Sequence, residues 1–146
     1  MTNVSRDPIR VTRRFEAAAE RVFDAWLDPE IAGRFLFTTP TGQMVRIDID
    51  PRPGGAFCFV DRRDGQDIGH VGEYIEIDRP RRLVFTFSVP AFSHEVSRVT
   101  IVIVPQGAGC ELTLTSENVP PEWAERTQEG WNTILEGLAT VLAVES

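Results

Sequence analysis

The chain contains no lysine: all fifteen of its basic residues are arginine, and with 22 acidic residues the net charge is −7. Without a side-chain amine, the protein cannot form a Schiff base with a carbonyl substrate. The lysine that holds nucleotide phosphates in a P-loop is also missing, which excludes nucleotide hydrolysis of that type. An acidic chain repels a phosphate backbone, so the composition argues against general nucleic-acid binding.

Residues suited to catalysis are also scarce, since the chain has two His, two Cys and one Tyr. Cys58 and Cys110 are far apart and fit no CxxC or zinc spacing. Each lies in an apolar stretch, which favours free thiols that pack as small hydrophobic side chains; a disulfide and a reactive thiol remain the alternatives. Acidic residues crowd positions 48–67 without a calcium-loop pattern, which argues against a metal site there. We expect no bound metal and no cofactor.

Long apolar runs are absent, because no segment approaches the roughly 20 residues that a membrane span needs. Residues 1–8 are polar and lack the apolar centre of a secretory signal. These two features predict a cytoplasmic protein with no membrane span. What remains is a chain of 146 residues, 42% hydrophobic and 25% charged, which is the composition of a soluble domain able to bury a core.

The spacing of apolar residues predicts a strand, two helices, six strands and a long final helix, in that order. Alternation of apolar and polar residues indicates strands over residues 9–16, 45–50, 56–60, 68–77, 83–89, 96–104 and 109–116. In the second of these, Val45, Ile47 and Ile49 share one face. Helical spacing covers residues 17–27, residues 29–35 and about three turns after Pro121.

The expected connections decide the fold class. Short turns such as Asp64-Gly65 join consecutive strands, so the sheet is antiparallel. Strands that follow one another, with helices at one side, define the α+β class. A sheet with one apolar face needs a cover, and the only long apolar helix predicted is the last one. We therefore predict a curved antiparallel sheet of about six to seven strands wrapped around a long C-terminal helix, with two short helices after the first strand.

Four stretches of the chain carry a family resemblance. They are AAERVFDAWLDPE at residues 18–30, PGGAF at 53–57, GEYIEIDRPRRLVFTF at 72–87, and LTLT at 112–115 followed by Gly130-Trp131 and spaced leucines. In these stretches the chain resembles the family related to the activator of heat-shock protein 90 ATPase, within the START-like (SRPBCC) helix-grip superfamily. It departs from the family at Phe35 or Phe87, where a Trp is usual, and at Ser116, where a His is frequent.

The resemblance implies a single helix-grip domain over residues 1–146 with a flexible tail at 1–7, and a cavity between the sheet and the C-terminal helix. Relatives hold lipids, polyketides, hormones or other apolar molecules there, and a few members of the superfamily catalyse cyclisation or hydrolysis. The eukaryotic activator contacts its chaperone largely through a second, N-terminal domain. A chain of 146 residues has no room for that domain, so the resemblance does not imply co-chaperone activity.

Ligand cavities are lined mainly by apolar and aromatic side chains with few polar groups. Sequence alone does not distinguish a filled core from a hollow one, and it is the resemblance that favours the hollow one. The candidate lining residues are Trp26, Phe35, Phe37, Phe57, Phe59, His70, Tyr74, Phe85, Phe87, Trp131, Leu135 and Leu138.

The strand over residues 68–77 has one face with His70, Gly72 and Tyr74 and another with Glu73. We expect the His70 face to point inward, because Gly72 would give clearance to the helix, and Glu73 is then solvated. The opposite orientation would place Glu73 in an apolar wall, with a raised pKa.

Two glycines, Gly130 and Gly137, lie seven residues apart on the final helix. Each costs about 1 kcal/mol relative to alanine in a helix interior, so each needs a reason. We expect close packing against a strand; clearance for a ligand is the alternative.

Three functions remain open. The favoured one is a module that binds an apolar or amphipathic small molecule. The second is an enzyme acting on a bound polyketide-like substrate, for which His70, Tyr74 and Glu73 are the strand candidates, although no complete catalytic set can be assembled from them. The third is a protein-interaction or chaperone-associated module. Homodimer formation is also open.

Overall fold

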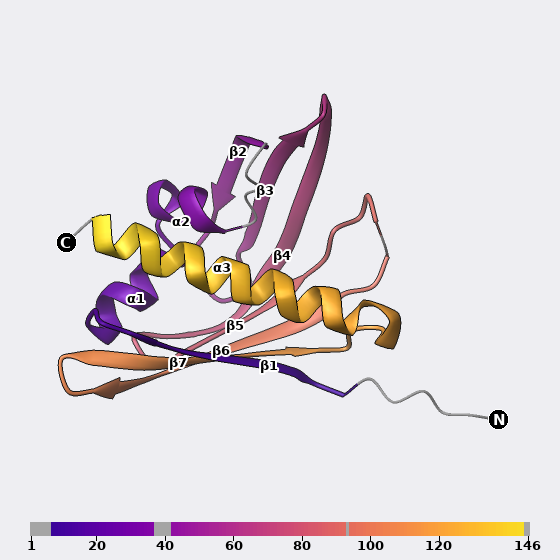
Figure 1. Cartoon of the computed structure of the whole chain (residues 1–146). Coiled ribbons are helices and arrows are strands. Elements are labelled where there is room, and N and C mark those ends of the chain that lie inside the picture. Colours follow the sequence, from indigo (N-terminus) through magenta and orange to yellow (C-terminus); the bar gives the residue numbers. More distant parts are fainter. Residues whose placement is uncertain (1–6, 37–41, 93, 145–146) are drawn as a thin grey trace.

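The computed structural model describes residues 7–36, 42–92 and 94–144, and it confirms the predicted helix-grip architecture. Seven strands form one antiparallel sheet in the order β1-β7-β6-β5-β4-β3-β2, and the long helix α3 lies across it (Figure 1). The expected tail over residues 1–7 falls almost wholly outside the described residues. The elements are β1 Ile9–Phe15, α1 Ala19–Ala25, α2 Pro29–Phe35, β2 Gln43–Ile49, β3 Ala56–Arg63, β4 Gln66–Asp78, β5 Arg82–Phe87, β6 Ser97–Gln106, β7 Gly109–Glu117, the 3-10 turn η1 Pro121–Trp123 and α3 Ala124–Val144.

The two short helices lie beside the C-terminal half of α3, and α2 contacts it directly (Figure 1). Asp28 caps the N-terminus of α2, and its side chain accepts a hydrogen bond of 3.0 Å from the backbone N–H of Glu30. Helix α1 is tied to the turn between β4 and β5, since the guanidinium of Arg79 donates to both carboxylate oxygens of Asp24 at 2.7 and 2.8 Å. This end of the sheet is therefore closed by helices.

Strand β2 departs from the predicted alternation. Its pairing with β3 passes from Met44 directly to Arg46, which leaves Val45 in a bulge. The bulge turns Val45 outward, so its side chain is exposed, while Met44 and Ile47 pack against the core. The prediction that Val45 shares a face with Ile47 and Ile49 was wrong for this reason.

Strand β4 presents the predicted face inward. His70 and Tyr74 are 5% and 3% exposed, and Glu73 is solvated. The reason for the glycine differs from the expected one: a Cβ on Gly72 would lie 1.9 Å from the carbonyl oxygen of Thr86 and 2.5 Å from the ring of Phe57. Gly72 thus gives clearance to β5 and to a neighbouring ring of β3, not to the helix.

Cys58 and Cys110 are both free thiols, as the sequence favoured. Cys110 is buried, and its burial raises the pKa of the thiol. None of the helices in the described part of the chain is long and apolar enough to cross a membrane. The described residues also contain no group of three or more side chains able to hold a metal ion.

Candidate functional site

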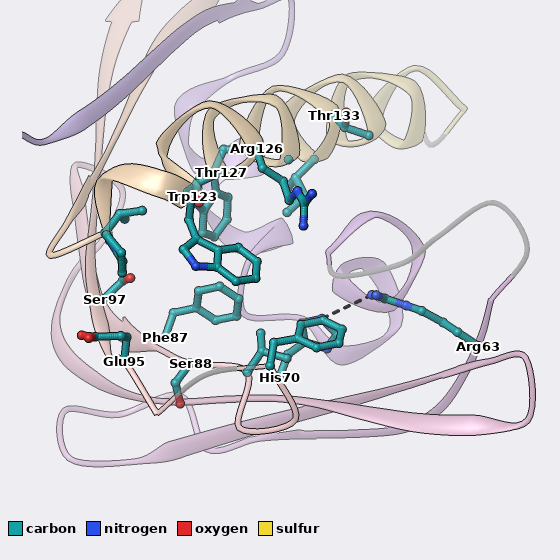
Figure 2. Close-up of a pocket in the computed structure, with 17 residues that line it drawn as sticks. Arg63, His70, Phe87, Ser88, Glu95, Ser97, Trp123, Arg126, Thr127 and Thr133 are labelled. Carbon is teal, nitrogen blue, oxygen red and sulfur yellow. Dashed lines mark hydrogen bonds between the residues drawn. The ribbon is translucent and has the colours of Figure 1, made fainter. Parts of the chain in front are cut away.

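A cavity of about 450 Å³ lies between the N-terminal half of α3 and strands β4 and β5 (Figure 2). The segment that leads from β5 to β6 closes another side, with Val89 and Phe92 in the wall. The chain just before α3 contributes Val119, Pro120 and Trp123. Most of this wall is apolar.

The helix side of the cavity follows a spacing of three and four residues along α3, including Thr127, Gly130, Trp131 and Ile134. A Cβ placed on Gly130 would have no atom within 4 Å, so this glycine faces open space. The expectation of close packing was therefore wrong for Gly130. Gly137 does pack closely, but against a helix rather than a strand, because its Cβ would lie 3.4 Å from the Cβ of Phe35 in α2.

Phe87 is the centre of the aromatic wall. Its ring lies parallel to the imidazole of His70, with centroids 6.2 Å apart, and edge-on to Trp131 at 5.7 Å. Three elements, β4, β5 and α3, thus meet through these rings, and all three residues line the cavity.

A second region of the inner face is nearly filled. Trp26, Phe57, Phe59, Tyr74 and Phe85 surround a space of only about 10 Å³. Around Phe57, the ring centroids of Phe59, Tyr74 and Phe85 lie 6.1, 5.4 and 5.5 Å away. This packed aromatic cluster lies beside the larger cavity and does not line it.

Of the twelve candidate residues, three line the larger cavity, five form the packed aromatic cluster, three lie elsewhere in the core and one is outside the described residues. His70, Phe87 and Trp131 line the larger cavity. Phe35 packs edge-on against Trp26 at 5.3 Å, and Leu135 and Leu138 are buried in the core. Phe37 lies outside the described residues. The cavity-lining residues that the sequence did not single out for this site are Arg63, Ser88, Val89, Phe92, Glu95, Ser97, Val119, Pro120, Trp123, Arg126, Thr127, Thr133 and Ile134.

A series of hydrogen-bonded polar groups extends from strand β3 to the wall of the cavity. The carboxylate of Asp61, which is 0% exposed, accepts a hydrogen bond of 2.7 Å from Nε of Arg63. Nη2 of Arg63 lies 3.4 Å from Nε2 of His70, and Nδ1 of His70 lies 3.3 Å from the carbonyl oxygen of Phe59. A guanidinium only donates and a carbonyl only accepts, so these contacts assign the proton of His70 to Nδ1 and leave Nε2 as the acceptor.

Residues 16–143 match the family model described as Activator of Hsp90 ATPase homolog 1-like protein. The chain belongs to this family. Among curated proteins, none matches the chain.

Solved structures share the fold of this family member over nearly its whole length. Protein CV1439 from Chromobacterium violaceum is 28% identical, with a TM-score of 0.83 over 92% of this chain and 95% of that one. A protein from Rhodobacter sphaeroides is 21% identical, with a TM-score of 0.82 over 99% and 98%. Protein SA2116 from Staphylococcus aureus, described as of unknown function, is 15% identical, with a TM-score of 0.81 over 98% of both chains.

The three strand residues considered for catalysis do not meet at one point in this family member. Glu73 is solvated, and Tyr74 lies in the packed aromatic cluster, where burial raises the pKa of its phenol. His70 lines the larger cavity. The trio named from the sequence therefore forms no joint catalytic site.

Burial lowers the pKa of His70 below its usual value of 6.5, and the charge of nearby Arg63 acts in the same direction. The unfolded chain consequently takes up this proton at a higher pH than the native protein does. The free energy of unfolding should therefore fall as the pH drops below about 6.5, and this loss should level off once the pH passes the native pKa. Above about 6.5 the imidazole should contribute no pH dependence.

The measurement is urea unfolding between about pH 8 and about pH 5, for the wild type and for His70→Gln. Glutamine keeps hydrogen-bonding capacity and does not titrate, so the difference between the two curves isolates His70. Equal pH dependence in both proteins would contradict a lowered pKa of His70 in the native protein.

Proposed function

We propose that this protein binds an apolar or amphipathic small molecule in the cavity between the sheet and the N-terminal half of α3. The observation that carries the proposal is the cavity itself, whose volume of about 450 Å³ falls within the range of ligand pockets. Its wall combines aromatic and aliphatic side chains with a few polar groups, which is the composition expected of such a pocket.

The helix supports the proposal through its choice of side chains. Gly130 lines the cavity at the edge of the apolar stripe of α3, where a larger residue would fill the space and favour the helix. An apolar void beside well-packed rings forfeits dispersion contacts on one side, and an apolar ligand would restore them. The glycine therefore fits a helix that leaves room for a ligand.

Binding is tested with Nile red, a neutral apolar dye whose fluorescence rises in apolar surroundings. We expect saturable binding by the wild type and competition by apolar molecules. Gly130→Leu should weaken dye binding about tenfold or more, because the new side chain occupies the cavity. The same variant should be as stable as the wild type or more stable by about 1 kcal/mol, since a helix-interior glycine has been removed.

The matched control is Asn132→Leu, which adds the same side chain to an exposed position of α3 that does not line the cavity. It should leave dye binding unchanged. If Gly130→Leu and Asn132→Leu bind the dye as tightly as the wild type, the dye is not in this cavity and the proposal fails.

A further inference from the structure

We infer that the ligand of this cavity is an amphipathic carboxylic acid, whose carboxylate is bound by Arg63 while its apolar part lies against Phe87, Trp123 and Trp131. This inference rests on the proposed function and specifies the ligand class for the same site. It is carried by the way in which one guanidinium is fixed at the wall of an otherwise apolar cavity.

Contacts with Asp61 and His70 fix the position of the Arg63 guanidinium. Its Nε donates to the fully buried carboxylate of Asp61 at 2.7 Å, and its Nη2 lies 3.4 Å from the acceptor nitrogen of His70. A guanidinium has five N–H groups, and these two contacts use two of them. Nη1 and the second N–H of Nη2 have no hydrogen-bond partner among the residues that the structure describes. Arg63 is thus a positioned donor with unused N–H groups at a cavity wall.

A ligand that fills this cavity would take water away from those N–H groups. Donors that lose water without gaining a partner oppose binding. The binding of a purely apolar ligand would therefore carry a desolvation penalty at the Arg63 end of the cavity. A carboxylate removes the penalty, because it accepts two parallel hydrogen bonds from a guanidinium and each is strengthened by charge.

The charged side chains that line the cavity also favour an anionic group at the Arg63 end. The charge of Arg63 is balanced by Asp61, but a second guanidinium, that of Arg126 on α3, also lines the cavity and lies 5.3 Å from the ring centre of Trp123. The acidic lining residue Glu95 lies with Ser97 toward the opposite end from Arg63 (Figure 2). An anionic group at the Arg63 end therefore meets positive charge and avoids the carboxylate of Glu95.

The experiment compares three ligands with the same apolar tail and different heads: decanoate, decanol and decylamine. Each competes with Nile red at neutral pH on the wild type and on Arg63→Met, which keeps an unbranched side chain and removes the charge. We expect decanoate to bind the wild type about tenfold or more tightly than decanol, with decylamine weakest. In Arg63→Met, decanoate should fall to the affinity of decanol, while decanol changes by no more than about twofold.

The control and a second variant keep the test interpretable. Arg62→Met alters the neighbouring residue of β3, which is exposed and paired with Asp67, and it should keep the preference for decanoate. Arg63→Met leaves Asp61 buried without its guanidinium, which threatens folding. The double variant Asp61→Asn with Arg63→Met removes that charge, and it should show the same loss of preference.

The outcomes separate this inference from the proposed function. If decanol matches decanoate on the wild type, or if the preference survives in a folded Arg63 variant, the inference is overturned while binding in the cavity stands. If none of the three molecules displaces the dye from the wild type, and Gly130→Leu still binds the dye, the proposed function itself is overturned.

Discussion

Replacement of Phe57 by alanine should lower the free energy of unfolding by about 3–5 kcal/mol. The ring is 4% exposed and contacts three other aromatic rings, and the free space beside it measures only about 10 Å³. Deletion would therefore create a new void in the packed aromatic cluster, in addition to the loss of apolar burial. Urea unfolding followed by far-ultraviolet circular dichroism measures the change directly.

The matched variant is Phe87→Ala, which lies at the larger cavity on β5, with β4 between it and the β3 strand of Phe57. One side of Phe87 already faces empty space, so its deletion enlarges an existing cavity and should cost less, about 1–2 kcal/mol. Equal losses for the two variants would contradict the division of the inner face into a filled and a hollow part. Phe87→Ala should also change dye binding. Phe57→Ala should leave dye binding unchanged, because Phe57 does not line that cavity.

This division gives the proposed function its physical basis. A protein of this size needs a filled core for stability, and the packed cluster lies beside the end of the sheet that α1 and α2 close. The N-terminal half of α3 instead contributes small residues such as Gly130 and Thr127 to the wall of the larger cavity. Stability and a ligand cavity can thus be provided by different residues under the same helix.

The sequence predicts the architecture well because periodicity is local. An alternation of two residues or a spacing of 3.6 residues shows which side of an element is apolar, and all seven strands and three helices lie where these patterns indicate. The bulge at Val45 escapes such reasoning, since one additional residue reverses the facing of its neighbours without any change in composition.

The site is harder to predict, because a cavity depends on the distance between two apolar faces rather than on either face alone. Twelve residues could be named as inward-facing, and only the folded structure separates Phe87 and Trp131 at the cavity from Phe57 and Tyr74 in the cluster. Arg63 carries no signal in the sequence, because it is a polar residue at the end of a strand. Gly130 did carry a signal, as a helix-interior glycine at the edge of an apolar stripe, but the expectation of close packing was wrong for it.

Gly72→Ala should be one of the most damaging single-methyl additions in the chain, with a loss of about 3 kcal/mol in the free energy of unfolding. The added Cβ would lie 1.9 Å from the carbonyl oxygen of Thr86, which is backbone and cannot rotate away. The strands are fixed at this point, since Val71 and Ser88 exchange backbone hydrogen bonds of 3.0 and 2.9 Å. Relief therefore requires separation of β4 from β5 or displacement of the Phe57 ring, and both disturb the packed cluster.

Gly69→Ala is the control for Gly72→Ala, because it places the same methyl group on the same strand with no atom within 4 Å. It should leave stability unchanged or raise it by about 0.5 kcal/mol, since alanine restricts the unfolded chain more than glycine does. Both variants are compared by urea unfolding. A comparable loss for the two would assign the effect to glycine's backbone flexibility, and a large loss for Gly72→Ala alone would assign it to the contact with β5. The second result is expected, because a strand residue tolerates a methyl group wherever the space beside it is open.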